Sequence, residues 1–237
     1  MSAGPYRLPA VAGKAIVGKE IVVGVSGGSG ARLGRRFVEL ALAAGGLSRL
    51  HLVVSDAALL VARSEIGPEV DSPEAWVAGL DVPRERRRRL EIHHNSNVGA
   101  SIASGSYPAA GMAVVPCSGG TLGSIANGIA RDLLQRAADV CLKERRPLVL
   151  ALRESPLSLV HIENMRLATL AGAIVAPPLA AFYVGSPSVD RFLDAYCERV
   201  LGLLGLDVRG EDFRWKGTGT AKATRPEKRP RRRATKR

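Results

Sequence analysis

EIVVGVSGGSGARLGRRFVELALAA, residues 20–44, is the stretch that decides the fold. A short apolar run ends in a loop of glycines and serines, and a segment whose apolar residues have helical spacing follows. A strand, a glycine loop and a helix in that order are typical of the first half of a βαβ unit. The stretch therefore predicts a parallel sheet covered by helices.

The same alternation continues along the chain. Further apolar runs of strand length are LHLVVS (50–55), RRLEIHH (88–94), MAVVPC (112–117) and PLVLALRE (147–154). Helical patterns occupy DAALLVARSEI (56–66), RDLLQRAADVCLKER (131–145), LSLVHIENMRLATLAG (157–172) and VDRFLDAYCERVLGLLG (189–205). Gly172 and Gly205 are expected to end the last two helices. The pattern predicts one doubly wound α/β sandwich with a mostly parallel sheet.

The net charge of +12 is concentrated at one end of the chain. Arg214–Arg237 contains 11 Lys or Arg and one acidic residue, so the remainder is close to neutral. This tail has almost no apolar residues to bury and is predicted to be disordered. It is either a solvated segment or a weak contact for nucleic acid, an anionic membrane surface or an acidic protein. We divide the chain into an N-terminal extension (1–19), a folded domain (20–208) and a basic tail (209–237).

Cysteine usage and hydropathy predict a cytoplasmic protein without a membrane span. Cys117, Cys141 and Cys197 are odd in number, far apart and set among apolar residues, which indicates reduced core thiols. Residues 1–20 lack the apolar centre of a signal peptide, and no run approaches the ~20 apolar residues of a membrane span. Prolines and the charge run RERRRR make residues 67–89 a predicted solvated excursion.

Polar residues and glycines follow the predicted strands, where parallel sheets bind their ligands. The glycines of Ser26–Gly30 allow close backbone approach, and the helix after them offers N–H groups to an anion. Ser55 ends the second strand, and PCSGGT (116–121) ends the fourth. These loops predict converging donors for a phosphate or a flavin edge. Such a turn can equally be a tight connection, and each serine a plain helix N-cap.

Charged residues at the end of another apolar strand point to the same edge of the sheet. Arg153 and Glu154 directly follow PLVLAL, which favours a site over packing, a structural ion pair being the alternative. His161, Glu163 and Asn164 do not share one helix face and are interpreted as structural.

The sequence positions of the histidines do not indicate a convincing metal site. His93 and His94 are adjacent, so they are expected on opposite faces of a strand, a poor geometry for a shared ion. No metal site is predicted.

Taken together, these motifs resemble the flavin prenyltransferases related to UbiX. The resemblance spans about Ile21 to Leu206, and its most specific block is RAADVCLKERRPLVLALRESPLSLVHIENM (136–165). The other matching motifs are VVGVSGGSGARLG (22–34), VVSDAA (53–58), ASIASGS (100–106), VVPCSGGTLGSIANG (114–128) and PPLAAFY (177–183). The first glycine loop is shared with flavoproteins that decarboxylate peptidyl cysteines.

The resemblance implies a flavodoxin/Rossmann-like three-layer sandwich that binds FMN and dimethylallyl phosphate. It also implies a homo-oligomer, a dodecamer with sites shared between subunits, and a UbiD-like decarboxylase that receives the prenylated FMN. Whether a monophosphate or a diphosphate donor is preferred stays open.

Site residues follow position by position from the same resemblance. Those implied to contact FMN are Gly27, Gly28, Ser29, Ser55, Ser118, Gly119, Gly120, Thr121 and Arg153. Those implied to contact the prenyl phosphate are Tyr183, Arg199, Lys143 and Ser104. Those implied to act in catalysis are Glu154, Ser29, Glu65 and Arg136.

The residue types suit the chemistry that the family performs. The reduced flavin attacks an allylic cation through N5, and C6 then closes a fourth ring. Arg199, Lys143 and Arg136 would stabilise charge on the departing phosphate in place of a metal ion. Glu154 would accept a proton, held in its charged form by Arg153.

Departures from the family pattern leave alternatives. Asp56 replaces the lysine common after the loop serine, which puts a negative charge near the flavin phosphate. Trp215 matches an aromatic residue of some members only weakly. A flavin-dependent cysteine decarboxylase of the same fold is one alternative, although PCSGGT stands where that family carries a PASANT-like loop. A non-catalytic flavin carrier subunit is the other.

Overall fold

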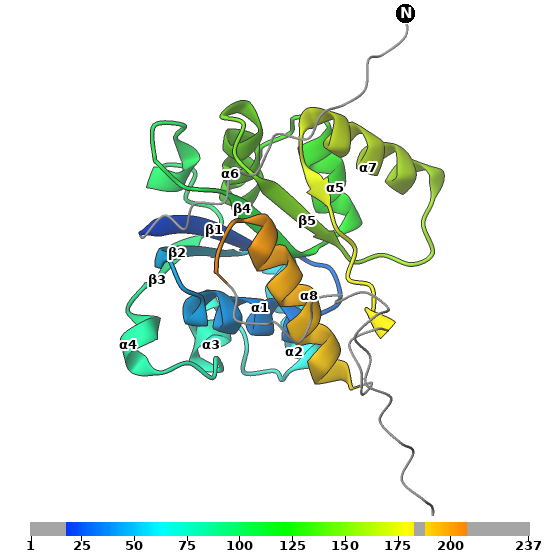
Figure 1. The fold of residues 1–237 in the computed structure, drawn as a ribbon. Coiled ribbons are helices and arrows are strands. Elements are labelled where there is room, and N and C mark those ends of the chain that lie inside the picture. Colours follow the sequence, from blue (N-terminus) through cyan, green and yellow to red (C-terminus); the bar gives the residue numbers. More distant parts are fainter. Residues whose placement is uncertain (1–17, 183–187, 208–237) are drawn as a thin grey trace, which may run out of the picture.

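Six strands form a single parallel sheet in the computed structural model, which describes residues 18–182 and 188–207 (Figure 1). The strands are β1 (Lys19–Val25), β2 (Leu47–Val54), β3 (Leu90–His94), β4 (Met112–Cys117), β5 (Leu148–Leu152) and β6 (Ile174–Val175). Their order in the sheet is β3-β2-β1-β4-β5-β6, and every neighbouring pair is parallel. The predicted doubly wound parallel sheet is confirmed. The basic tail and residues 1–17 of the extension lie outside the described residues.

Eight α-helices and one short 3₁₀ helix lie between or after the described strands. They are α1 (Ala31–Ala43), α2 (Asp56–Glu65), α3 (Pro73–Ala78), α4 (Arg84–Arg87), η1 (Ser101–Ala103), α5 (Gly119–Ala126), α6 (Leu133–Lys143), α7 (Leu159–Ala171) and α8 (Val189–Leu203). Gly172 and Gly205 follow the ends of α7 and α8 with φ of 108° and 69°, the left-handed region that glycine adopts without strain. Both glycines end their helices as predicted.

The strand order reverses between β1 and β4, and this reversal places the candidate site. The chain moves outward from β1 to β2 and β3, then returns to the other side of β1 as β4. In open parallel sheets, ligands bind at the carboxyl ends of the strands at such a switch point. The loops after β1 and β4 meet there.

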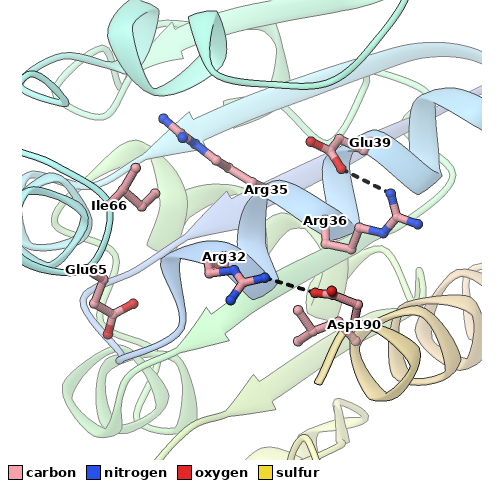
Figure 2. A pocket seen from close by; sticks show the side chains of 8 residues that line it. Arg32, Arg35, Arg36, Glu39, Glu65, Ile66 and Asp190 are labelled. Atoms are coloured by element: carbon pink, nitrogen blue, oxygen red, sulfur yellow. Dashed lines mark hydrogen bonds and ion pairs between the residues drawn. The ribbon is translucent and has the colours of Figure 1, made fainter. Parts of the chain in front are cut away.

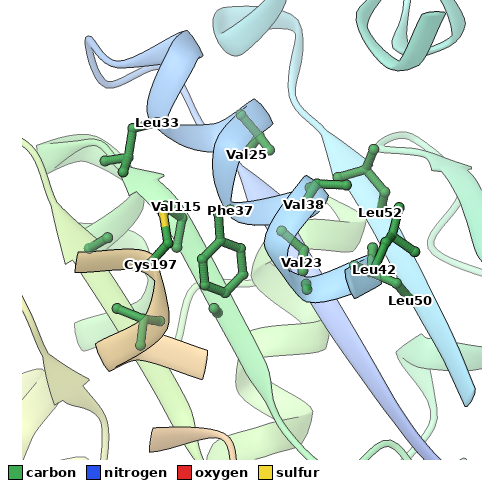
Figure 3. Packing of buried hydrophobic residues seen from close by; sticks show 14 of the residues in the cluster. Val23, Val25, Leu33, Phe37, Val38, Leu42, Leu50, Leu52, Val115 and Cys197 are labelled. Carbon is green, nitrogen blue, oxygen red and sulfur yellow. The ribbon is translucent and has the colours of Figure 1, made fainter. Parts of the chain in front are cut away.

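Both faces of the sheet are covered by helices that bury apolar side chains. On one face, Phe37 of α1 is fully buried among Val23, Leu52, Val115 and Cys197 of the sheet and α8 (Figure 3). On the other face, α5, α6 and α7 bury a second cluster against the same strands. The two clusters make the three-layer sandwich that the family resemblance implied.

The stretch between α2 and β3 corrects a sequence-based expectation. It was predicted to be a solvated excursion, and most of its charge run is exposed, but Trp76 of α3 is fully buried in the core. Ser72 caps α3 by accepting a hydrogen bond from the Ala75 N–H at 3.2 Å, and Pro73 occupies the first turn. A serine and a proline that look like loop punctuation therefore begin a helix here.

The three cysteines are free and buried, as expected for core thiols. Burial raises the pKa of Cys117 to about 12, so this thiol stays protonated near neutral pH. Within the described residues, no helix has both the length and the apolar character needed to cross a membrane.

Candidate active site

One buried hydroxyl joins the loops after β1 and β4. Ser26 Oγ accepts a hydrogen bond from the Ser118 N–H at 2.8 Å, and the Ser26 hydroxyl donates to the Pro116 carbonyl at 3.1 Å. The Ser26 N–H donates to the same carbonyl at 3.1 Å. Because these bonds link neighbouring strand ends, the two glycine loops are held in place before a ligand arrives.

Two glycines of the first loop allow it to approach the adjoining loops closely. A Cβ atom on Gly27 would lie 2.6 Å from the Cβ of Ala57, so glycine is required beside the start of α2. A Cβ atom on Gly28 would lie 3.4 Å from the Cys117 carbonyl oxygen and 3.5 Å from the Arg153 Cβ. The structure thus brings together the ends of β1, β4 and β5, as the sequence predicted.

The serines after β2 and β4 are helix caps. Ser55 accepts a hydrogen bond from the Ala58 N–H at 3.1 Å at the start of α2. Ser118 accepts one from the Thr121 N–H at 3.2 Å and donates to Thr121 Oγ1 at 3.0 Å at the start of α5. The plain-cap alternative therefore holds for both serines. Helix geometry still leaves the N–H groups of Gly119 and Gly120 without an acceptor inside α5, so they can serve a ligand.

Glu65 occupies the start of α1 and corrects another expectation. That helix was predicted to offer free N–H groups to an anion. Instead Glu65 accepts hydrogen bonds from the Gly30 N–H at 3.0 Å and from the Ala31 N–H at 2.7 Å. Burial works to raise the pKa of Glu65, but bonds from Ser29 and these two N–H groups, with the Arg153 charge, lower it overall. The first N–H groups of α1 are thus taken by a carboxylate, and of the helix starts singled out by the sequence those of α2 and α5 remain.

Glu154 and His161 reach the start of α5. From the position that a Cβ atom would take on Gly119, Glu154 Oε2 lies 3.7 Å away and His161 Nε2 lies 2.9 Å away. Glu154 Oε1 accepts a hydrogen bond from the Ser155 N–H at 3.1 Å, and its side chain is exposed. An exposed carboxylate and an imidazole thus flank the helix start that the sequence predicts to bind FMN.

His161 is the residue near the site that the sequence interpretation treated as structural. Its Nδ1 accepts a hydrogen bond from the Ser158 N–H at 3.2 Å, and its own N–H donates to Ser158 Oγ at 3.3 Å. In the neutral ring this leaves the proton on Nε2, which faces Gly119. The Ser-x-x-His spacing, which resembles a capping box, was the available signal.

The phosphate-binding candidates on α6 form a separate group. Arg136 Nε donates to the Ala103 carbonyl at 3.1 Å, and Lys143 pairs with Glu144 beside the loop that holds Ser104. Lys143 ends α6 just before β5 begins, whereas Arg153 follows the end of β5. Lys143 and Arg153 therefore lie at opposite ends of the strands within one chain.

The remaining prenyl phosphate candidates are only partly described. Arg199 is exposed on α8, a helix that packs along α1. The first turn of α8 is held by an ion pair of its Asp190 with Arg32 of α1 at 2.9 Å. Arg199 lies more than two turns further along α8, away from the Glu154 loop. Tyr183 and Trp215 fall outside the described residues.

Asp56 lies in the first turn of α2, directly after the Ser55 cap, and is exposed. An acidic residue there stabilises the helix through its dipole. The same charge opposes an anionic ligand at this helix start, which was the concern raised by the sequence. The start of α5 carries no acidic residue in its first turn.

A polar groove lies on the outer side of α1, next to Glu65 (Figure 2). Its arginines are engaged: Arg36 pairs with Glu39 at 3.2 Å and with Asp194 at 2.5 Å. Arg35 places its guanidinium 5.7 Å from the ring centre of the buried Trp76. These contacts fasten α1 to its neighbours.

Comparison with known sequences places this arrangement in a family. A model of the Flavoprotein family matches residues 12–191. Flavin prenyltransferase UbiX of Thauera aromatica is 45% identical over 188 residues, covering 79% of this chain and 90% of that protein. Flavin prenyltransferase UbiX of Escherichia coli K12 is 39% identical over 201 residues, covering 84% of this chain and 99% of that protein.

Solved structures agree with the sequences. AnUbiX (PadA1), in complex with FMN and dimethylallyl pyrophosphate, superposes with a TM-score of 0.70 at 39% identity, covering 84% of this chain and 98% of that one. A dodecameric FMN-dependent UbiX-like decarboxylase from Escherichia coli O157:H7 superposes with a TM-score of 0.72 at 36% identity, covering 84% of this chain and 100% of that one. The cysteine decarboxylase TvaF, at 16% identity and a TM-score of 0.51, shares the fold alone. The chain belongs to the Flavoprotein family and, within it, to the UbiX flavin prenyltransferases.

Proposed function

We propose that the protein transfers a dimethylallyl group from dimethylallyl phosphate to reduced FMN, giving prenylated FMN. The observation that carries the proposal is the meeting of Gly28, Arg153 and Glu154 beside the start of α5. It is supported by the 39% identity to a structure that holds both FMN and a dimethylallyl phosphate compound.

The switch point has the features that FMN requires. A flat ring needs backbone without side chains, and Gly27, Gly28, Gly119 and Gly120 supply it around Arg153. A Cβ atom on Gly120 would meet nothing within 4 Å, which is the open space that a ligand needs. A phosphate needs N–H donors, which the starts of α5 and α2 provide. We assign FMN to the loops at these two helix starts because Glu65 fills the start of α1.

Reduced FMN would be the nucleophile: its N5 would replace phosphate on the prenyl carbon, breaking the C–O bond, and would lose a proton. The prenyl double bond would then gain a proton as C6 bonds to it, and C6 would lose its own proton. Glu154, whose carboxylate reaches the start of α5, accepts one of these protons. Arg153 binds the flavin edge and balances the Glu154 charge. Ser29 and Glu65, linked by a hydrogen bond, form a second proton-handling pair next to Arg153.

The phosphate end of the donor needs cations, and within the described residues Lys143 lies at the other end of the strands from Glu154. Arg136, Lys143 and Arg199 are the candidates, with Ser104 and Tyr183 as neutral partners. Because Lys143 lies at the other end of the strands from Glu154, we propose that a neighbouring subunit brings these residues to the site. Their positive charges then stabilise the departing phosphate without a metal ion.

Apolar surface on α7 supports such an assembly. Leu159, Val160 and Leu170 are 72%, 67% and 61% exposed, and Phe182 beyond the helix is 93% exposed. Exposed apolar side chains gathered on one helix are typical of an interface. We propose that copies of the chain pack through this helix, in a dodecamer like that of the relative from Escherichia coli O157:H7.

The product requires a recipient. Prenylated FMN is a cofactor, so we propose that it passes to a UbiD-like decarboxylase. The reduced, buried cysteines support a cytoplasmic location for this exchange.

Phosphate release tests the proposed reaction. We expect anaerobic protein with reduced FMN and dimethylallyl phosphate to release one inorganic phosphate per flavin, with or without EDTA. A parallel reaction with oxidised FMN and a peptide ending in cysteine tests the decarboxylase alternative. Loss of CO₂ from the peptide and no phosphate release would contradict the proposal. Tight FMN binding with neither reaction would favour the carrier subunit.

A further inference from the structure

Two histidines and a glutamate from neighbouring strands meet on one face of the sheet. His51 of β2 is in register with Glu91 of β3, and His93 lies two residues further along the same strand. Side chains two residues apart on a strand share a face, so the three side chains lie together. His94 points to the other face and is exposed, as the sequence predicted for this adjacent pair.

The ligand atoms of the three side chains are close to one another. His51 Nδ1 lies 2.9 Å from His93 Nε2 and 3.8 Å from Glu91 Oε2, and His93 Nε2 lies 3.5 Å from Glu91 Oε1. A tetrahedral zinc ion with bonds of about 2.0–2.2 Å holds its ligand atoms about 3.3–3.5 Å apart. The three distances join the two histidine nitrogens to each other and each nitrogen to a different Glu91 oxygen, and they lie on both sides of that value. Small side-chain rotations can therefore bring both nitrogens and one carboxylate oxygen onto one ion.

We propose that His51, Glu91 and His93 bind a divalent transition-metal ion of the Zn²⁺ type, with water as the fourth ligand. Two imidazoles and one carboxylate are a ligand set that zinc accepts. Both imidazoles are buried, His51 fully and His93 to 8% exposure, while the Glu91 side chain remains 39% exposed and leaves a route for the ion.

A second carboxylate orients the first histidine. His51 Nε2 lies 3.2 Å from Glu20 Oε2, and Tyr107 donates its hydroxyl proton to the same oxygen. A proton on Nε2 shared with Glu20 leaves the lone pair of His51 on Nδ1, which faces the proposed ion. Carboxylate, histidine and metal in this order are typical of zinc sites, where the outer carboxylate fixes the tautomer. The Glu20 contact is an observation independent of the ligand distances.

The charges around the cluster suit a divalent cation. Glu91 and Glu20 are acidic, and Arg49 donates to Glu91 Oε2 at 2.7 Å, which leaves Glu91 Oε1 for the ion. Sequence reasoning missed the cluster because His51 and His93 lie 42 residues apart and meet only through the sheet.

The proposed ion would have a structural effect. It would fasten the edge strand β3 to β2 and, through Glu20 and Tyr107, to β1 and the loop after η1. The ion is separate from the transfer reaction, which is proposed to need no metal. Failure of one proposal therefore leaves the other standing.

Metal titration of the untagged full-length protein tests the site. After removal of metals with a chelator, we expect one equivalent of Co²⁺ per chain to give the visible absorption of a tetrahedral site, and Zn²⁺ to displace it. His93→Gln should weaken Zn²⁺ binding at least about 100-fold, and Glu20→Gln about 10–100-fold, the usual effect of losing an outer carboxylate. His94→Gln is the matched control and should bind like the unchanged protein.

Folding is checked by thermal unfolding in EDTA, where the variants should have the same Tm as the unchanged protein. Added Zn²⁺ should raise the Tm of the unchanged protein but not that of His93→Gln. If His93→Gln does not fold, Glu91→Gln decides, because that side chain is partly exposed. Absence of stoichiometric binding would overturn the proposal and leave a closed hydrogen-bond network. Equal weakening by His94→Gln, or none by His93→Gln and Glu91→Gln, would overturn it as well.

Discussion

Glu154 combines an exposed carboxylate with a fixed place beside the start of α5. If it accepts a proton during the transfer, Glu154→Gln removes the base and leaves the flavin loops intact. We expect kcat to fall at least about 100-fold, as for a lost general base, with the Kd for FMN within a factor of about two. Single-turnover assays and flavin fluorescence measure the two quantities.

Glu85→Gln is the matched control for that change, because Glu85 is exposed on α4. It should leave kcat unchanged. Full activity in Glu154→Gln would remove Glu154 from the mechanism.

Glu65 stabilises α1 by accepting the N–H groups of Gly30 and Ala31, so its loss should lower stability. We expect Glu65→Gln to reduce the free energy of unfolding by about 1 kcal/mol at pH 7, as for a lost helix cap. The folded-state pKa of Glu65 is lowered, so its contribution is present above the unfolded pKa of about 4.3 and is lost as pH falls through the folded value. Urea unfolding at pH 7 and at acid pH measures this.

The difference in free energy of unfolding between Glu65→Gln and the unchanged protein should therefore shrink in acid. Glu85→Gln, in the exposed charge run, is the control and should leave the urea midpoint unchanged. Equal midpoints for Glu65→Gln and the unchanged protein at pH 7 would contradict the capping role.

Single residues could be predicted where their chemistry is local. The glycines and serines after β1 and β4 were found because strand, loop and helix are consecutive in sequence. Glu65 at the start of α1 and His51 beside His93 were not, because each contact joins elements that only the folded sheet brings together.

The loop between β1 and α1 passes close to the ends of β4 and β5 at Gly28. A methyl group there would meet the Cys117 carbonyl and Arg153 at ordinary contact distances, so Gly28→Ala should fold. The same methyl group would occupy the space proposed for the flavin. We expect the Kd for FMN to rise at least about tenfold, as for overpacking of about 1.4 kcal/mol, measured by flavin fluorescence.

Gly202→Ala is the matched control, because a Cβ atom on Gly202 of α8 meets nothing within 4 Å. It should bind FMN normally and gain about 0.5–1 kcal/mol of stability from the removal of a helical glycine. Normal FMN binding by Gly28→Ala would place the flavin elsewhere.

Among the elements, the long helices and central strands were predictable from periodicity, and the short ones were not. β6 has only two residues, Ile174 and Val175, too few for a period to show. In α3, prolines and charges around Trp76 hid a core residue, because burial there depends on the packing of α3 beneath α1.

At the scale of the whole molecule, Lys143 lies at the other end of the strands from Glu154, which underlies the proposal that a second subunit completes the site. Arg136→Ala and Glu154→Gln should each be inactive alone. If sites are shared between two chains, subunit exchange in an equal mixture should restore activity in roughly a quarter of the sites. The rate of phosphate release after exchange measures this, and no recovery in confirmed mixed oligomers would contradict shared sites.

The central claim is that the assembled protein prenylates FMN, and the mass of the flavin that it releases tests this most directly. Purified protein is incubated without oxygen with reduced FMN and dimethylallyl phosphate, and the flavin is extracted for mass spectrometry. We expect a flavin heavier by one five-carbon prenyl unit, absent when dimethylallyl phosphate is omitted. Unmodified flavin recovered from protein that binds both FMN and the donor would contradict the claim.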